Sequence, residues 1–191
     1  MRGPRRFAAL FFYASLGAAL ALQAVPARAQ NESSPQRDAT REQLRQTLQT
    51  GGSRADVGVV FRQSLKNPYN FVGSMTTGLT NSDSLEIVVS VTNSSTIGFR
   101  IYPHYHGGYI NLGKAKDRVE LMRRLLGYSN DNFLFWGADD TSDVFSGYTF
   151  TLESGFPSDA IIIVLRSIHN TDKYVGEMRP AIDGSVAPAA K

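Results

Sequence analysis

The fold is decided by the stretch Tyr128–Met178, which reads YSNDNFLFWGADDTSDVFSGYTFTLESGFPSDAIIIVLRSIHNTDKYVGEM. It contains two strongly apolar segments, residues 133–137 and 144–153, separated by the acidic turn Ala138–Ser142. In the second segment large apolar side chains alternate with Thr and Glu, a pattern typical of a half-buried antiparallel strand. An isolated hairpin is marginally stable in water, so we expect the amphipathic segment that follows to cover this one.

That C-terminal segment is predicted to be one long helix. Ser158 and Asp159 are residues that commonly start helices. Apolar residues then recur at helical spacing, namely Ile161, Val164, Leu165, Ile168 and Val175. The run 161–165 alone is also compatible with a buried strand, but a strand would explain only those five residues. We therefore favour a helix that continues to about residue 179, followed by a disordered tail, residues 180–191.

The region before the first strand is predicted to hold two helices. The first follows a polar leader within residues 30–52, with Thr40 and Gln43 as a capping box and Gly51-Gly52 at its end. The second is expected to begin at Ser53 and to stop near Asn67-Pro68, because proline disfavours its continuation. Its apolar stripe consists of Val57, Val60, Phe61 and Leu65.

Three strands are expected next, over residues 70–77, 84–92 and 96–106. The middle one alternates apolar with polar residues most clearly. Pro103 cannot donate to a strand ladder, so the third strand is either an edge or ends its regular pairing there. A helix is then predicted from Lys114 or Asp117 to Leu126, with Gly127 as its stop.

The resulting order is α-α-β-β-β-α-β-β-α. Runs of strands interrupted by single helices, with short connections, predict an α+β fold in which helices pack on an antiparallel sheet. The main domain is expected over residues 53–179.

The first 29 residues have the pattern of a cleavable signal peptide. Arg2, Arg5 and Arg6 precede an apolar run, and Ala27-Arg28-Ala29 forms a small-x-small cleavage box. We expect cleavage between Ala29 and Gln30 and a periplasmic or secreted protein. The apolar run approaches the length of a membrane span, so a retained anchor is the alternative.

Charge and cysteine content narrow the function classes. The chain has 20 Lys and Arg against 17 Asp and Glu, but residues 1–29 hold four of the Arg and no acid. The remaining chain has 16 basic and 17 acidic residues, a net charge of −1, which offers no basis for nucleic-acid binding. No stable membrane span is expected after signal cleavage. The chain has no cysteine, so thiol catalysis and thiolate metal sites are excluded.

Several segments carry a family resemblance: VELMRRLLGYSNDNF (residues 119–133), the turn GADDTSD, the strand YTFTLESG and the terminal helix. Over residues 54–178 the chain resembles the YbjN family, bacterial proteins whose fold is similar to that of type III secretion chaperones. The resemblance implies a regulatory or chaperone-like binding role and, since type III chaperones dimerise, a possible homodimer. It implies no catalytic residues. The export signal is a departure, because many relatives are cytoplasmic.

His104-Tyr105-His106 is the one motif with metal-ligand spacing. Residues two apart on a strand point to the same side, so both imidazoles could reach one zinc or copper ion. A zinc site needs at least a third protein ligand, which the sequence does not place, and two exposed histidines are the favoured interpretation. A metal or small-ligand binding protein of the cell envelope, using Arg100, Tyr102, His104 and His106, is therefore the alternative function.

The aromatic hairpin supplies the binding candidates. Leu134 and Trp136 fall on the opposite side of their strand from Phe133 and Phe135, so one side must meet something other than the same core. Trp136 is the first candidate for an interface anchor, with Phe135 and Tyr148 beside it. No G-x-S-x-G elbow and no phosphate-binding loop is present. The sequence thus predicts a non-enzymatic protein without cofactor that binds another protein or itself.

Overall fold

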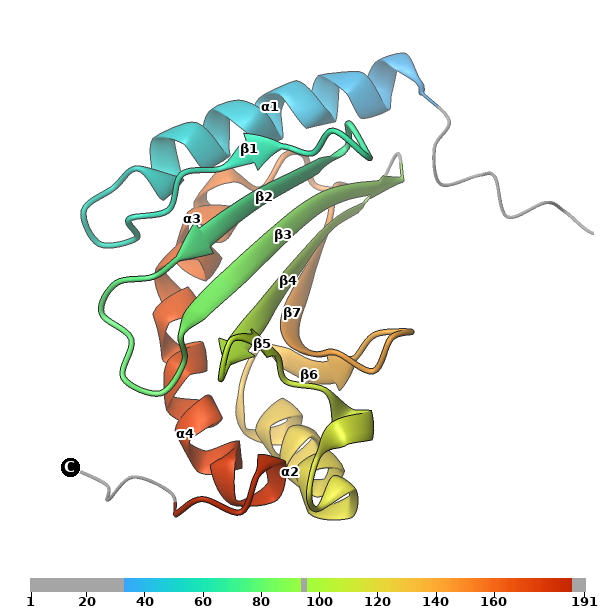
Figure 1. The fold of residues 1–191 in the computed structure, drawn as a ribbon. Coiled ribbons are helices and arrows are strands. Elements are labelled where there is room, and N and C mark those ends of the chain that lie inside the picture. Colours follow the sequence, from blue (N-terminus) through green and yellow to red (C-terminus); the bar gives the residue numbers. More distant parts are fainter. Residues whose placement is uncertain (1–32, 94–95, 187–191) are drawn as a thin grey trace, which may run out of the picture.

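The computed structural model describes residues 33–93 and 96–186, which form an α+β fold (Figure 1). The predicted signal peptide and its cleavage site lie outside these residues. The elements, in chain order, are α1 (Pro35–Gly52), β1 (Arg62–Gln63), β2 (Asn70–Met75), β3 (Ser84–Asn93), β4 (Thr96–Tyr105), β5 (Gly108–Tyr109), the 3-10 helix η2 (Leu112–Lys114), α2 (Arg118–Asp131), β6 (Phe135–Ala138), β7 (Val144–Thr151), α3 (Ser158–Ser167), the 3-10 turn η3 (Ile168–Asn170) and α4 (Thr171–Ile182).

All strands of the described residues join one antiparallel sheet in the order β1-β2-β3-β4-β7-β6, and β5 pairs with the end of β4. The predicted α+β fold with an antiparallel sheet is therefore confirmed. The prediction that the strand bearing Pro103 is an edge is wrong, because β4 lies between β3 and β7. Its alternative is confirmed on one side only: pairing with β7 covers Thr96–Ile101 and ends before the proline, whereas pairing with β3 continues through Pro103 to His104.

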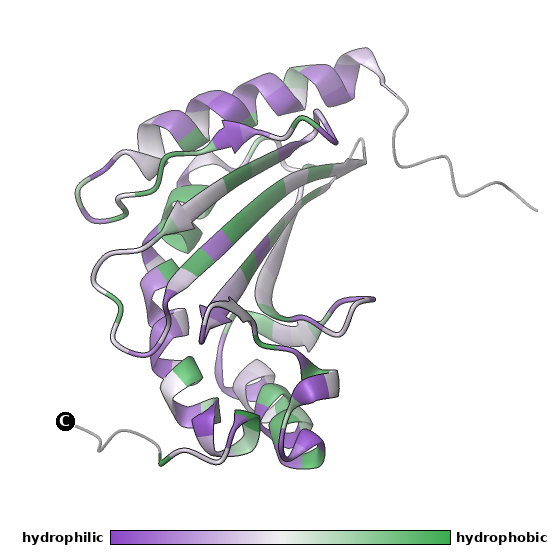
Figure 2. Ribbon diagram, in the orientation of Figure 1, coloured by the Kyte–Doolittle hydropathy of each residue, from purple (hydrophilic) through white to green (hydrophobic). Residues whose placement is uncertain are grey.

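One face of the sheet carries the main core. In β3 the residues Leu85, Ile87, Val89 and Val91 are fully buried, and they point toward helices α1 and α3. Figure 2 shows apolar and polar residues following one another along this strand. A second cluster joins α2, α4 and the β6–β7 hairpin, and consists of Ile110, Leu121, Leu125, Tyr128, Trp136, Val144, Val175, Met178 and Ala181. The predicted covering of the hairpin by the C-terminal helix is observed here.

Helix α1 begins earlier than predicted and belongs to the same domain. Its N-cap is Ser34, whose hydroxyl accepts a hydrogen bond from the Arg37 amide, and Pro35 occupies the first turn. Thr40 lies inside the helix and donates to the Gln36 carbonyl, so the predicted capping box is wrong. Leu44 and Leu48 are fully buried in the main core, which ties this helix to the sheet.

The second predicted helix, from Ser53 to about residue 66, is absent. Residues 53–57 form a turn instead, and residues 58–61 have no regular secondary structure, with Val57, Val59 and Phe61 buried and Val60 exposed. The same residues fit a period of two as well as a helical period, and Gly58 decides between them because its φ of 66° breaks a helix. The segment then continues into the short edge strand β1.

Gly52 is required where the chain folds back after α1. A Cβ on Gly52 would overlap the Val59 carbonyl oxygen and lie 2.9 Å from Phe61 Cδ2. We expect Gly52→Ala to lower the free energy of unfolding by about 1–3 kcal/mol, measured by urea denaturation. Gly127→Ala is the matched control, because its Cβ would meet nothing within 4 Å, and it should stabilise α2 by about 0.5–1 kcal/mol. Equal effects of the two variants would contradict this packing.

The other two predicted helices are present with different bounds. The middle helix α2 begins after the N-cap Asp117, one of the two predicted starts, but it passes Gly127 and ends at Asp131. The long C-terminal helix is divided into α3 and α4 by the turn η3, and it reaches Ile182 with Pro180 inside its last turn. The alternative strand at residues 161–165 is therefore wrong. Among the described helices, none is long and apolar enough to span a membrane.

Candidate binding face

The sheet presents a second face, opposite the main core, that no described helix covers along β2, β3 and β4 (Figure 1). The strand register aligns a row of residues across this face, in the order Arg62, Val72, Val88, Arg100, Gly147 and Phe135. The neighbouring row includes Tyr102 of β4. We call the surface formed by Val72, Val88, Arg100, Tyr102, Phe135 and Phe145 the open face.

Aromatic rings from three strands gather on the open face. The Phe135 ring lies edge-on to Phe145, with 5.8 Å between centroids, and Phe145 lies 5.5 Å from Tyr102. Gly147 makes this arrangement possible, because a Cβ there would lie 2.8 Å from Phe135 Cζ. Phe135 nevertheless remains 42% exposed, far more than a core aromatic residue. Tyr102 and Phe145 are only 9% and 6% exposed, so Phe135 is the one ring of the three that the face offers to solvent.

Arg100 is the cation at the centre of this face. Its guanidinium lies 4.6 Å from the centroid of Phe145, and its Nη1 donates to the Tyr102 hydroxyl at 3.2 Å. Burial raises the pKa of Tyr102, and the neighbouring guanidinium opposes that shift. Two aromatic contacts therefore orient the guanidinium while the side chain stays exposed. A guanidinium held in this way offers its remaining N–H groups to a carboxylate or another anion.

A hollow of about 440 Å³ lies beside Arg100. Its lining includes the side chains of Asn70, Ser90, Thr149 and Phe135, and no carboxylate among the described residues. The second arginine in the lining, Arg37, is buried, donates to the Val91 carbonyl at 2.7 Å and stacks 3.7 Å over the Tyr69 ring. Arg37 is therefore part of the framework, whereas Arg100 faces the hollow. The chemistry of this lining suits an anionic group with apolar neighbours.

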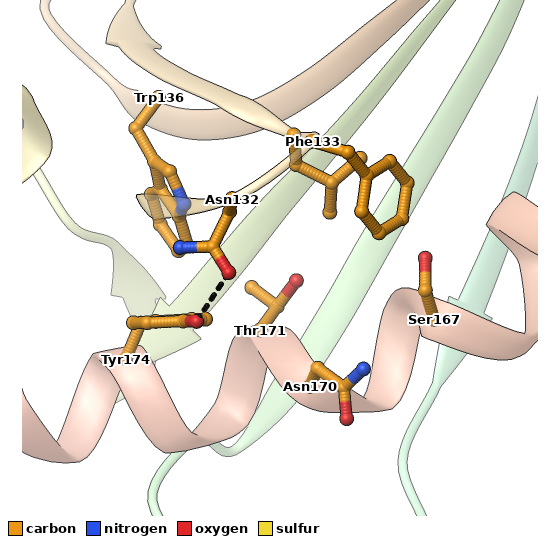
Figure 3. Close-up of a pocket in the computed structure, with 8 residues that line it drawn as sticks. Asn132, Phe133, Trp136, Ser167, Asn170, Thr171 and Tyr174 are labelled. Carbon is orange, nitrogen blue, oxygen red and sulfur yellow. Dashed lines mark hydrogen bonds between the residues drawn. The ribbon is translucent and has the colours of Figure 1, made fainter. Parts of the chain in front are cut away.

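Trp136, the predicted interface anchor, lies in the core. Its side chain is only 6% exposed, and its ring packs against Tyr128 and Tyr174 at 5.6 and 5.5 Å. Figure 3 shows it beside a small cavity of about 30 Å³, where the Tyr174 hydroxyl donates to Asn132 Oδ1 at 2.5 Å. The indole is covered by α2 and α4, so this protomer offers no tryptophan surface to a partner. The prediction that Trp136 anchors an interface is therefore wrong, because its side chain is buried.

The other two aromatic candidates occupy different places. Phe135 lies on the open face, as described above. Tyr148 is opposite Phe99 in the β4–β7 pairing, so it points to the core side, where its ring lies 4.8 Å from Phe150. Tyr148 is half-buried and is one of the residues that line the hollow. Of the three residues, Phe135 is the one that the fold leaves available for binding.

The two histidines do not share one site. His104 lies on the open side of β4 and packs 4.3 Å from the Tyr109 ring. His106 falls beyond the strand in a turn with a φ of 55°, where it stacks on Tyr105 and its Nδ1 lies 3.8 Å from Asp183 Oδ2. The expected same-side alignment fails because the strand ends one residue before His106. Within the described ranges no group of three His, Cys, Asp or Glu is arranged to hold a metal ion.

Tyr109 closes the lower end of the open face. Its hydroxyl donates to Glu86 Oε1 at 3.1 Å, and its ring lies 5.8 Å from Tyr102. Burial, followed by the nearby Glu86 carboxylate, raises the pKa of Tyr109 to about 12. This phenol stays protonated at physiological pH, so it can donate its hydrogen bond to the Glu86 carboxylate there.

The fold and this face define an α+β protein with an exposed aromatic and cationic sheet surface. Strand alternation alone places Arg100 beside Tyr102, but the contact of Arg100 with Phe145 depends on the pairing of β4 with β7, which the sequence does not show. No family model matches the sequence, and no curated protein matches it.

Proposed function

We propose that this protein is a non-enzymatic binding protein whose open face holds a segment of another polypeptide that carries a carboxylate. The observation that supports this proposal is the exposed Arg100 guanidinium, oriented by Phe145 and Tyr102 beside the exposed Phe135. Aromatic residues and arginine are the side chains most enriched at binding hot spots. The partner chemistry that matches them is an acidic group next to apolar side chains.

A polypeptide suits this face better than a small molecule does. Small-molecule sites are concave and bury most of their ligand, whereas the open face extends over neighbouring strands from Val72 to Phe135. The hollow beside Arg100 has room for side chains of a partner, and Phe135 presents an exposed ring at its lining. The resemblance to the YbjN family and its chaperone-like fold agrees with such a role, in the cell envelope if the predicted signal peptide is cleaved.

The proposal predicts which peptides the protein selects. A phage-displayed library of random peptides would be selected on the chain Gln30–Lys191 and, in parallel, on its Arg100→Ala and Phe135→Ala variants. We expect the wild type to enrich peptides in which Asp, Glu or a free C-terminus lies next to apolar residues. Arg100→Ala should bind such peptides at least about tenfold more weakly, because a charge-assisted hydrogen bond is lost.

Matched controls separate the face from the rest of the surface. Arg45→Ala removes an exposed arginine that pairs with Glu42 on α1, and it should leave peptide binding unchanged. Peptides that bind Arg100→Ala and Phe135→Ala as tightly as wild type would refute the proposal, and so would a selection without enrichment.

The family resemblance implies a homodimer without saying which surface forms it, and self-association through the open face is tested separately. Sedimentation velocity of wild type and Phe135→Ala distinguishes a dimer formed through the open face from one formed elsewhere, because only the former would dissociate in the variant.

A further inference from the structure

Helix α2 has two apolar sides, of which the fold uses one. Leu121, Leu125 and Tyr128 are buried against the second core cluster. On the other side Val119 is 72% exposed, Met122 40% and Leu126 72%. These three residues are spaced i, i+3 and i+7, so they form one continuous stripe along the helix. Single exposed apolar residues are ordinary, but a stripe of three on one short helix indicates a surface that is covered in use.

The charges around this stripe identify what covers it. Residues 114–126 carry five basic and two acidic residues, a net charge of +3, within a chain whose residues 30–191 carry a net charge of −1. The basic residues are Lys114, Lys116, Arg118, Arg123 and Arg124. Both acids are engaged locally, since Asp117 caps the helix and Glu120 pairs with Arg123 at 2.7 Å and with Arg124 at 2.8 Å.

The positions of the arginines on the helix complete the pattern. At 3.6 residues per turn, Arg118 lies on one flank of the stripe and Arg123 on the other. The Arg123 side chain is 71% exposed, and its ion pair with Glu120 at the surface is weak enough to rearrange. A helix with an apolar stripe between basic flanks is suited to lie in the plane of a membrane surface, with its long cationic side chains reaching the headgroups.

We propose that α2 is a peripheral membrane-binding helix that inserts Val119, Met122 and Leu126 into the interface of an anionic lipid surface. The basic flanks supply the attraction to the headgroups, and the stripe supplies the apolar contact. This inference does not depend on the open face, which lies on the sheet and uses other residues. It also requires no membrane-spanning helix, because the helix lies in the interface.

The test is sedimentation of the protein with lipid vesicles. The chain Gln30–Lys191 would be mixed with vesicles of pure phosphatidylcholine and with vesicles of equal parts phosphatidylcholine and phosphatidylglycerol. We expect binding to the anionic vesicles to be at least about tenfold stronger, and to weaken in about 0.5 M NaCl as the surface charges are screened. Equal binding to both vesicle types, or no binding to the anionic ones, would overturn the proposal.

Variants assign the binding to α2. The double variant Val119→Gln with Leu126→Gln should lose about tenfold or more in vesicle binding, and circular dichroism should show the fold intact because both side chains are exposed. The matched control is Ile163→Gln, which removes a 61% exposed apolar side chain from α3 and should bind vesicles like wild type. The double variant Lys114→Gln with Arg118→Gln should reduce binding to the anionic vesicles and leave binding to the phosphatidylcholine vesicles unchanged. Unchanged binding by the α2 variants, or an equal loss in the Ile163 control, would contradict the assignment.

Discussion

Replacing Asp172 by alanine is expected to lower the free energy of unfolding by about 3–5 kcal/mol, which is a large fraction of the stability of a domain of this size. The Asp172 side chain is in the first turn of α4 and is only 5% exposed. Its carboxylate accepts hydrogen bonds from the backbone amides of Thr80, Asn81 and Ser82, at 2.9, 3.0 and 2.7 Å. Alanine would leave these three amides without an acceptor in a partly buried place.

The loop between β2 and β3 depends on this carboxylate. A further hydrogen bond, from Arg179 Nη2 to the Asn81 carbonyl at 3.0 Å, joins the loop to the same helix. Urea denaturation followed by circular dichroism measures the loss. Asp159→Ala is the matched control, because Asp159 occupies the first turn of α3 but is exposed, and it should cost less than about 1 kcal/mol. Similar costs for the two variants would refute the anchoring role of Asp172.

The same carboxylate should make stability depend on pH. Burial acts to raise the pKa of Asp172, but the hydrogen bonds from Thr80, Asn81 and Ser82 outweigh burial and the pKa is lowered from its ordinary value of 3.8. A lowered pKa in the folded state means that the stabilisation is complete above the pKa of the unfolded chain and is lost as the pH falls through the folded pKa. We therefore expect the stability difference between wild type and Asp172→Ala to be constant near neutral pH and to narrow below about pH 4. A difference that stays constant down to pH 2 would contradict this linkage.

Replacing Trp136 by alanine is the second change with a large expected effect, about 3–5 kcal/mol of unfolding free energy. The indole fills the space between Tyr128 of α2 and Tyr174 of α4, so its removal leaves a cavity in the second core cluster. The neighbouring Phe135 is the informative comparison. Because Phe135 is 42% exposed, Phe135→Ala should cost about 1 kcal/mol in stability and should weaken peptide binding.

These two variants separate packing from binding within one short strand. Thermal unfolding measures the stability of both, and the affinity for a selected peptide measures the binding of both. Trp136→Ala, at a temperature where it is folded, should bind the peptide like wild type. A Trp136→Ala protein of normal stability and impaired binding would reinstate the tryptophan as the interface anchor and would contradict its burial.

The alternation of apolar and polar residues made the strands of the sheet predictable. Short segments that fit more than one pattern were not predicted correctly. In β3 every second residue is apolar from Leu85 to Val91, so only one interpretation fits. Residues 57–61 fit two periods because valines stand at both 59 and 60, and the choice of helix was wrong there. The strand containing His104 was predicted one residue too long, which placed His106 on the wrong surface. A short apolar run decides neither its period nor its exact end.

The side chains of the open face were predictable from the sequence only in part. The alternation correctly put Phe135 and Trp136 on opposite sides of β6, but Phe133 precedes the strand and lines the same cavity as Trp136. Which side α2 and α4 would cover depended on tertiary packing. Trp136 was therefore chosen over Phe135 on residue type alone. Asp172 carried no signal, because an aspartate in the first turn of a helix is common and its partners are about 90 residues away.

The most direct test of the binding proposal is a charge exchange between Arg100 and the acidic residue of a selected peptide. Isothermal titration calorimetry would compare wild type with Arg100→Glu, using the peptide and a version with its acidic residue replaced by lysine. We predict that Arg100→Glu loses at least about tenfold in affinity for the acidic peptide and recovers affinity for the lysine peptide. Wild-type affinity of Arg100→Glu for the acidic peptide, or no recovery with the lysine peptide, would contradict the assignment of Arg100 as the carboxylate-binding residue.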